Sequence, residues 1–165
     1  MRIFLAGAAG AIGRRLVPLL LAAGHHVVGT TRSTSKADLL RAAGVEPVVL
    51  DIFDSAPLTR AVSAARPDIV IHQLTDLPPG LDPGQMAEGT RRNARMRSEG
   101  TRSLVSAALA SGARRLIAQS IAWMYAGIAT TLRRGSARYR RAGRACDHRG
   151  RRRGSGAARH FVAAD

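Results

Sequence analysis

The chain has 165 residues, of which 45% are hydrophobic and 4% aromatic, and it carries a formal net charge of +15. This length suits one domain with an aliphatic core, and no apolar run approaches the ~20 residues of a membrane-spanning helix. The single cysteine, Cys146, excludes an intramolecular disulfide and a cysteine-cluster metal site, and the histidines lack zinc spacing, so no metal site is expected. The first expected strand starts at residue 2, which leaves no room for a signal peptide and favours a cytoplasmic location.

The residues up to Ala126 alternate short apolar strands with helices. Strands are expected at residues 2–6, 26–30, 47–50, 69–72 and 115–119, and helices at about 11–23, 36–43, 57–65 and 86–110. The strands are continuous apolar runs, which is typical of parallel strands covered on both faces. Right-handed crossovers then predict an α/β fold, with a doubly wound parallel sheet of the Rossmann-like order 3-2-1-4-5.

The positive charge is concentrated in the last quarter of the chain. Residues 1–126 have a net charge of +6, whereas residues 127–165 have a net charge of +9 and include eleven arginines. The second part shows no helix or strand periodicity, so we expect a domain at 1–126 and a disordered or irregular Arg/Gly-rich tail at 127–165 that is not part of the fold. The tail leaves open non-specific nucleic-acid binding, but no recognised nucleic-acid motif predicts sequence-specific binding.

The most informative motif is Gly7-x-x-Gly10-x-x-Gly13, which lies between the first expected strand and the first expected helix. Gly7 permits a tight turn, Gly10 lets the backbone approach a pyrophosphate, and Gly13 allows close packing of the helix. The helix N-terminus and its dipole then favour the phosphates. The alternative is a tight turn that binds nothing. The expected cofactor contacts in this loop are Gly7, Ala9, Gly10, Ala11, Ile12 and Gly13.

The segment after the second expected strand bears on the choice of dinucleotide. It holds no carboxylate before Asp38, whereas an NAD site needs an acid that accepts the ribose hydroxyls. Arg32 is placed to pair with a 2′-phosphate, and Thr31, Ser33 and Lys36 offer further donors. NADP is therefore favoured over NAD as the cofactor. The alternative for Arg32 is a solvated loop arginine.

Several motifs in one order carry a family resemblance. They are Gly7-x-x-Gly10-x-x-Gly13, Asp51, Asn93, Gly100-Thr101-x-x-Leu104-Val105-x-Ala107-Ala108 and Ser120-Ile121-Ala122-Trp123-Met124-Tyr125-Ala126. On these matches residues 1–126 resemble the N-terminal part of the extended short-chain dehydrogenase/reductases, the NAD-dependent epimerase/dehydratase family. Members of that family are longer and have a C-terminal substrate domain, so the resemblance implies a truncated chain with an incomplete sheet and an aberrant tail.

The resemblance adds further expected cofactor contacts. It implies that Asp51, with its neighbour Ile52, faces the adenine. Gln73 and Leu74, within the segment 72–75 at the end of the fourth strand, would line the ribose side through backbone atoms. Asn93 would support the active-site end of the sheet. The alternatives are a strand-terminal capping role for Asp51 and an exposed helical position for Asn93.

The residues that the family uses for catalysis are missing. Its Tyr-x-x-x-Lys pair is absent, because the only lysine is Lys36, and Ile121 stands where the family commonly has Ser or Thr. Ser120 and Tyr125 are the remaining, weak catalytic candidates. We expect an NADP-binding oxidoreductase domain that is catalytically incompetent as written. The alternative is a non-catalytic NADP-binding sensor; neither substrate nor oligomeric state is predicted.

Overall fold

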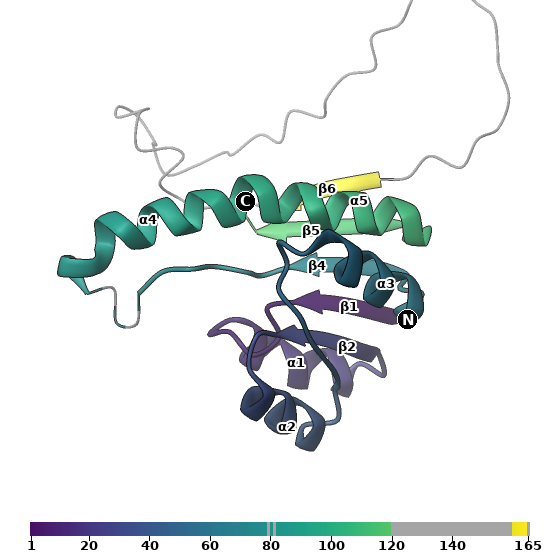
Figure 1. Cartoon of the computed structure of the whole chain (residues 1–165). Coiled ribbons are helices and arrows are strands. Elements are labelled where there is room, and N and C mark those ends of the chain that lie inside the picture. The colour runs from purple at the N-terminus through teal and green to yellow at the C-terminus, as the bar shows by residue number, and fades with distance from the viewer. Residues whose placement is uncertain (79, 81, 120–159, 165) are drawn as a thin grey trace, which may run out of the picture. The chain divides into compact units, whose positions relative to one another are not determined.

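The computed structural model of the chain describes residues 1–78, 80 and 82–119, together with the backbone of 160–164. Its centre is one parallel sheet in the order β3-β2-β1-β4-β5-β6 (Figure 1). The strands are β1 (Arg2–Ala6), β2 (His26–Thr31), β3 (Glu46–Val49), β4 (Ile69–His72), β5 (Arg115–Gln119) and β6 (His160–Ala164). The predicted α/β class and the order 3-2-1-4-5 are confirmed.

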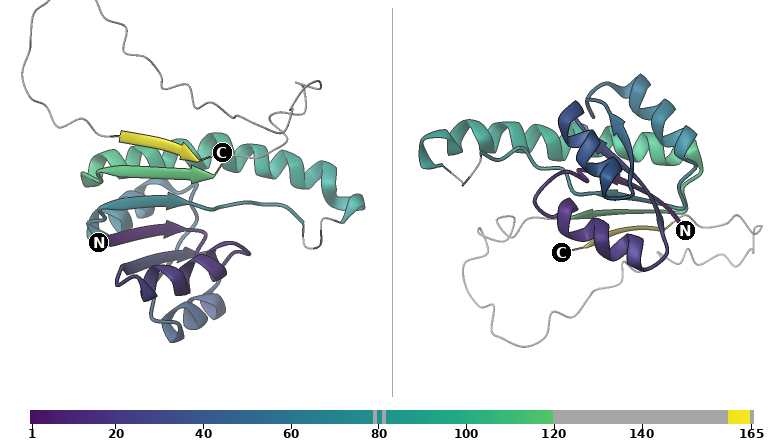
Figure 2. Two further views of the ribbon diagram at one scale, coloured as in Figure 1. Left: turned by 180° about the vertical axis from the view of Figure 1, so that it is seen from behind. Right: turned by 90° about the horizontal axis from the view of Figure 1, so that it is seen from below.

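Helices cover both faces of the sheet (Figure 2). They are α1 (Gly13–Ala22), α2 (Thr34–Ala42), α3 (Ser55–Ala65), α4 (Met86–Arg95) and α5 (Thr101–Ser111), with a short 3₁₀ turn at Pro83–Gln85. Buried residues of α1 and α2 pack in one core, and those of α3 and α5 in the other. This three-layer arrangement leaves the carboxyl ends of the central strands free to form a site.

Strand β1 explains why the strands show no alternation of apolar and polar residues. Ile3 and Leu5 belong to the core beneath α1 and α2, whereas Phe4 belongs to the core beneath α3 and α5, and each of the three is at most 3% exposed. Successive side chains of a strand point to opposite faces, so a strand covered on both faces must be apolar at every position. Each fully buried side chain of this kind contributes roughly 1.5–3 kcal/mol.

The helix expected at 86–110 is interrupted by a π-helical turn, Met96–Gly100, which joins α4 to α5. Met96 and Gly100 are both buried there. A Cβ on Gly100 would lie 3.0 Å from the Met96 sulfur and 3.6 Å from the side chain of Ile52. The absence of a side chain at Gly100 therefore lets this turn pack closely against the segment after β3.

Strand β6 differs from the sequence-based expectation. The sequence predicts that residues 127–165 lie outside the fold, whereas residues 160–164 pair in parallel with β5, from Arg115 opposite His160 to Gln119 opposite Ala164. A five-residue segment after an arginine-rich stretch carries little local signal, whereas the open edge of β5 offers a full row of backbone partners. The rest of residues 127–165 lies outside the described residues, as do the catalytic candidates Ser120 and Tyr125 of the expected domain.

Candidate cofactor site

The loop after β1 is a tight turn that requires its glycines. Gly7 has φ +92°, in the left-handed region that favours glycine, and a Cβ there would lie 2.8 Å from the carbonyl oxygen of Gln73. The Gly7 N–H donates to the Thr30 hydroxyl at 3.2 Å, and the Gly10 N–H donates to the Gly7 carbonyl at 2.9 Å. A side chain on Gly13 would overlap that same carbonyl. The glycine spacing thus builds a compact cradle at the start of α1.

The N-terminus of α1 stands open beside this cradle. Among the described residues, no side chain caps the helix, and its first turn contains no acidic residue. Orphan N–H groups at a helix N-terminus bind anions well, because the helix dipole adds to their hydrogen bonds. The loop and the helix start therefore fit a pyrophosphate.

A cleft of about 190 Å³ lies at the carboxyl ends of β1, β2 and β4. It is lined by residues from the loop after β1, from the end of β2 and the start of α2, and from the segments after β3 and β4. Of the predicted cofactor residues, it includes Gly7, Ala9, Gly10, Thr31, Arg32, Lys36, Ile52, Gln73 and Leu74. Ser33 and Thr75, also anticipated, line it as well, and sequence reasoning missed Thr30, Leu50 and Met96.

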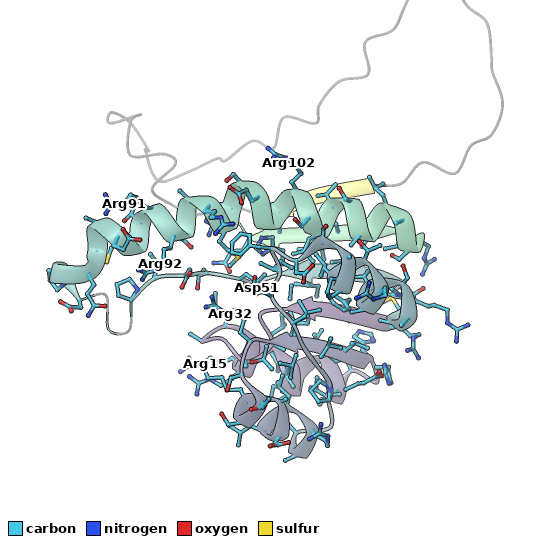
Figure 3. All side chains as sticks on the ribbon, in the orientation of Figure 1. Arg15, Arg32, Asp51, Arg91, Arg92 and Arg102 are labelled. Carbon is cyan, nitrogen blue, oxygen red and sulfur yellow. The ribbon has the colours of Figure 1, made fainter. Side chains whose placement is uncertain are left out.

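The other predicted residues lie beside the cleft without lining it. Ala11 and Ile12 are exposed on the loop that enters α1, and Gly13 packs against the loop itself. Asp51 is exposed, and its carboxylate accepts a hydrogen bond from the Phe53 N–H at 3.0 Å (Figure 3). Its expected orientation toward an adenine stays a prediction.

Asn93 is buried, with 4% of its surface exposed, although its neighbours on α4 are charged. Its Oδ1 accepts a hydrogen bond from the backbone N–H of Asp76 at 3.2 Å. Asn93 therefore holds the segment that follows β4, whose residues Gln73–Thr75 form one wall of the cleft. The alternative of an exposed helical position for Asn93 is thus excluded, and its role at the cofactor stays a prediction.

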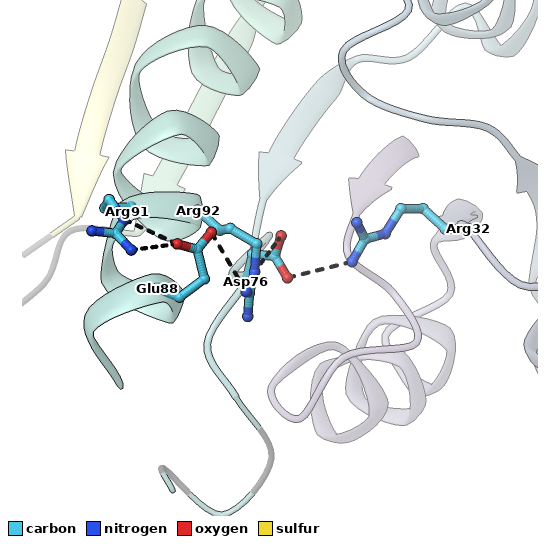
Figure 4. Close-up of polar contacts among 5 residues, drawn as sticks. All are labelled: Arg32, Asp76, Glu88, Arg91 and Arg92. Carbon is cyan, nitrogen blue, oxygen red and sulfur yellow. Dashed lines mark hydrogen bonds and ion pairs between the residues drawn. The ribbon is translucent and has the colours of Figure 1, made fainter. Parts of the chain in front are cut away.

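Arg32 lies at the mouth of the cleft and is 58% exposed. Its Nη2 is 3.6 Å from the Asp76 Oδ1, and the other oxygen of Asp76 is 3.7 Å from Arg92 Nε (Figure 4). Sequence reasoning gave Asp76 no role. No local pattern could have shown it, because 44 positions separate it from Arg32 and only the fold brings the two together.

A group of polar side chains lies at the end of β4. His72 is buried, and its Nδ1 accepts a hydrogen bond from the Leu74 N–H at 3.2 Å. Burial, with a further contribution from the charge of Arg97, lowers the pKa of His72 to about 4, so the imidazole is neutral at neutral pH. Burial also lowers the pKa of Arg97, whose Nη1 donates to the Gln119 carbonyl at 2.7 Å.

Some buried polar atoms near the cleft have no hydrogen-bond partner within the part of the chain that the structure describes. They are His72 Nε2, Gln73 Oε1 and Arg97 Nε. Gln73 is among the residues that line the cleft, but its amide oxygen is buried. The glycine cradle is therefore the feature of the cleft that fits a dinucleotide.

Two other features are absent from the part of the chain that the structure describes. No helix of the described residues is long and apolar enough to span a membrane. Nor do these residues contain a group of three His, Cys, Asp or Glu residues that could hold a metal ion. The glycine cradle and its cleft are thus the feature of the described chain on which a functional assignment rests.

A doubly wound parallel sheet with a glycine cradle between its first strand and first helix defines a dinucleotide-binding Rossmann domain. The chain belongs to the NAD(P)H-binding family, whose model matches residues 7–154. The match extends beyond residue 126, the predicted end of the family resemblance. It confirms that this is an NAD(P)-binding domain.

Individual relatives support the same assignment. The chain is 47% identical over 123 residues to a 3-diazoavenalumate denitrifying reductase from Streptomyces, a match that covers 74% of this chain and 38% of the relative. Among solved structures it is similar to the Bordetella bronchiseptica enzyme WbmG in complex with NAD and UDP (TM-score 0.63, 26% identity, 79% of this chain and 40% of that chain). A putative epimerase from Burkholderia cenocepacia is comparable (TM-score 0.60, 28% identity, 75% and 38%).

These comparisons confirm the predicted resemblance to the NAD-dependent epimerase/dehydratase family. The comparisons also show how much of each relative the chain covers. The chain spans less than half the length of the curated relative and of both solved structures.

Proposed function

We propose that this NAD(P)-binding domain prefers NADP(H) to NAD(H), and that the chain as written does not transfer hydride at the rate of its family. The observation that carries the preference is the position of Arg32, an exposed guanidinium at the mouth of the cleft. The described residues that line the cleft lie within 1–126, and we assign cofactor binding to that part of the chain.

The surroundings of Arg32 favour a phosphate on the adenosine ribose. Arg32, Ser33 and Lys36 follow β2 and line the same cleft. A guanidinium binds a phosphate through two parallel hydrogen bonds, and the hydroxyl and ammonium groups can add further donors. The 2′-hydroxyl of NAD(H) offers no charge to these groups, so the same residues stabilise it less. The WbmG structure contains NAD, which is a statement about that enzyme alone.

The proposal of low catalytic activity rests on missing side chains. Acid–base catalysis beside a nicotinamide needs a positioned proton donor whose pKa is tuned by its neighbours. The Tyr-x-x-x-Lys pair that supplies this donor in the family is absent, and Lys36 lines the cleft on the side of Arg32. The Streptomyces relative is a reductase, and we propose that this chain corresponds to the cofactor-binding part of such an enzyme.

The test is a pair of affinity measurements on the full chain. Arg32→Ala should weaken NADPH binding by ~1.5–3 kcal/mol, the scale of a hydrogen bond to a charged group, and leave NADH almost unchanged. Arg102→Ala is the matched control, because Arg102 is an exposed arginine on α5 that does not line the cleft (Figure 3). Equal losses for both cofactors would contradict the NADP(H) preference, and a wild-type chain that binds neither would contradict the cofactor role.

A further inference from the structure

The ion pair between Arg32 and Asp76 joins two walls of the cleft. Arg32 follows β2, and Asp76 follows the wall segment Gln73–Thr75 after β4. In the sheet β1 lies between β2 and β4, so the loop that carries Gly7 and Gly10 lies between the two partners. Figure 4 shows the side chains of Arg32 and Asp76 pointing toward each other from these two sides. A dinucleotide seated on the glycine loop must therefore lie next to this pair.

Asp76 holds its position through contacts that do not involve Arg32. Its backbone N–H donates to the buried amide of Asn93, and its Oδ2 is 3.7 Å from Arg92 Nε. The carboxylate is only 23% exposed. If Arg32 moved to another anion, Asp76 would keep its place and its negative charge at the mouth of the cleft.

The contact of Asp76 with Arg32, like its contact with Arg92, is looser than the hydrogen bond to Asn93. At 3.6 Å, the distance between Nη2 and Oδ1 is too long for a hydrogen bond, and the guanidinium is more than half exposed. A phosphate monoester offers three strong acceptor oxygens and a charge near −2, so it can form the short bidentate hydrogen bonds that Asp76 does not form. Arg32 is thus free to exchange the carboxylate for a phosphate.

We propose that Asp76 is a specificity-determining residue: its carboxylate competes with the 2′-phosphate of NADPH for Arg32 and reduces the preference for NADPH over NADH. This inference rests on the proposed function, because it requires the 2′-phosphate to bind at Arg32. Asp76 opposes NADPH in two ways. The ion pair between Asp76 and Arg32 must break before Arg32 can bind the phosphate. The negative carboxylate also repels the negative phosphate directly.

The experiment compares dissociation constants for NADPH and NADH in the full chain and its Asp76→Asn variant at low ionic strength, where screening is weakest. Removal of the carboxylate should tighten NADPH binding about two- to fivefold, the range of one exposed ion pair. NADH carries no 2′-phosphate, so its dissociation constant should change by a clearly smaller factor. In the Arg32→Ala background, the same substitution should tighten NADPH binding by a smaller factor, because only the repulsion between the carboxylate and the phosphate is then removed.

Glu88→Gln is the matched control. Glu88 contacts Arg91 and Arg92 in the same group of charges but not Arg32 (Figure 4), so its removal deletes one negative charge without freeing the cleft arginine. It should leave the NADPH-to-NADH ratio unchanged. Thermal unfolding checks that each variant is folded; should Asp76→Asn fail to fold, Asp76→Ser carries the same prediction, because the Asn93 bond uses the backbone N–H.

The outcomes separate the two proposals. Equal tightening of both cofactors by Asp76→Asn, or a changed ratio in Glu88→Gln, would show a general charge effect and overturn the role of Asp76. An unchanged ratio in Asp76→Asn, in a chain whose NADPH preference still depends on Arg32, would overturn this inference alone. A wild-type chain with no affinity for either dinucleotide would overturn both.

Discussion

The carbonyl oxygen of Gly7 occupies the space in which a side chain on Gly13 would begin. The Gly10 N–H donates to that same carbonyl. One backbone carbonyl thus accepts the hydrogen bond of the turn and also faces the start of α1. The carbonyl of Ala8 also lies 2.5 Å from the position of a Cβ on Gly13. The third glycine of the motif therefore serves the packing of the helix against the loop rather than contact with the cleft.

Gly13→Ala should consequently displace the loop. We expect a loss of stability of about 1–3 kcal/mol, as for other overpacked sites, together with weaker binding of NADPH and NADH alike. Thermal unfolding and cofactor titration measure the two effects. Gly84→Ala is the control, because a Cβ at Gly84 meets only the Asp82 carboxylate, at an ordinary 3.5 Å. Unchanged cofactor affinity in Gly13→Ala would contradict the role of the loop.

Asn93→Leu should destabilise the wall of the cleft. The substitution keeps a similar volume but leaves the Asp76 N–H without its acceptor, which costs about 1–3 kcal/mol where the group is shielded from water. Chemical denaturation measures the loss, and cofactor titration should show weaker binding as Gln73–Thr75 shift. Ser98→Ala, which removes only an exposed hydroxyl bonded within its own helix, should change neither. A fully stable Asn93→Leu variant with wild-type affinity would refute this role.

His72 makes the stability of the fold depend on pH. Its imidazole is buried, and its pKa falls from an ordinary 6.5 to about 4 in the folded chain. Between these values the unfolded state binds more protons, so stability rises with pH across this window and falls as the pH is lowered from 6.5 toward 4. The loss from this one group should reach about 3 kcal/mol at most.

Urea unfolding across this pH window measures the effect. His72→Asn removes the titrating group, so the difference in unfolding free energy between wild type and variant should change with pH within the window and stay constant above it. A difference that is the same at every pH would show that the burial of His72 does not govern its protonation.

A purified, folded chain assayed with NADPH against carbonyl compounds and nucleotide sugars should show no turnover near the ~10 s⁻¹ median of enzymes. Loss of one positioned acid–base group typically costs about 10²–10⁴-fold. Binding of NADPH by the same sample is the control for a folded site. Turnover near the median would contradict the proposal, and Ser120 and Tyr125 would then be the first residues to substitute.

The elements that were predicted well from the sequence are those whose conformation depends on residues close together in the chain. The first strand and the fifth were predicted with the bounds that the structure shows, because each is an apolar run between polar or glycine-rich segments. The glycine cradle was predicted for the same reason, since its backbone requirements lie within the seven residues from Gly7 to Gly13.

What the sequence could not provide depends on distant contacts. Met96 lines the cleft, and Asp76 contacts Arg32, because of the path that the chain takes after β4, which no local pattern describes. Asn93 stands among arginines that suggest an exposed helix face, yet it is buried because the segment after β4 covers it. Strand β6 pairs with an edge that lies more than 40 residues away in the sequence.

The π-helical turn at Met96–Gly100 makes the connection between the cleft and the core tolerant of a change in chain length. A π turn behaves as one residue inserted into an α-helix, so the flanking helices keep the orientation of a regular helix one residue shorter. Deleting one residue inside the turn would therefore leave Asn93 and Leu104 facing their present partners. A deletion in α5 between Leu104 and Ala107 would instead turn these two buried residues by about 100° relative to each other. Within this helix, the turn is thus where related chains can differ in length by one residue without losing the cleft wall.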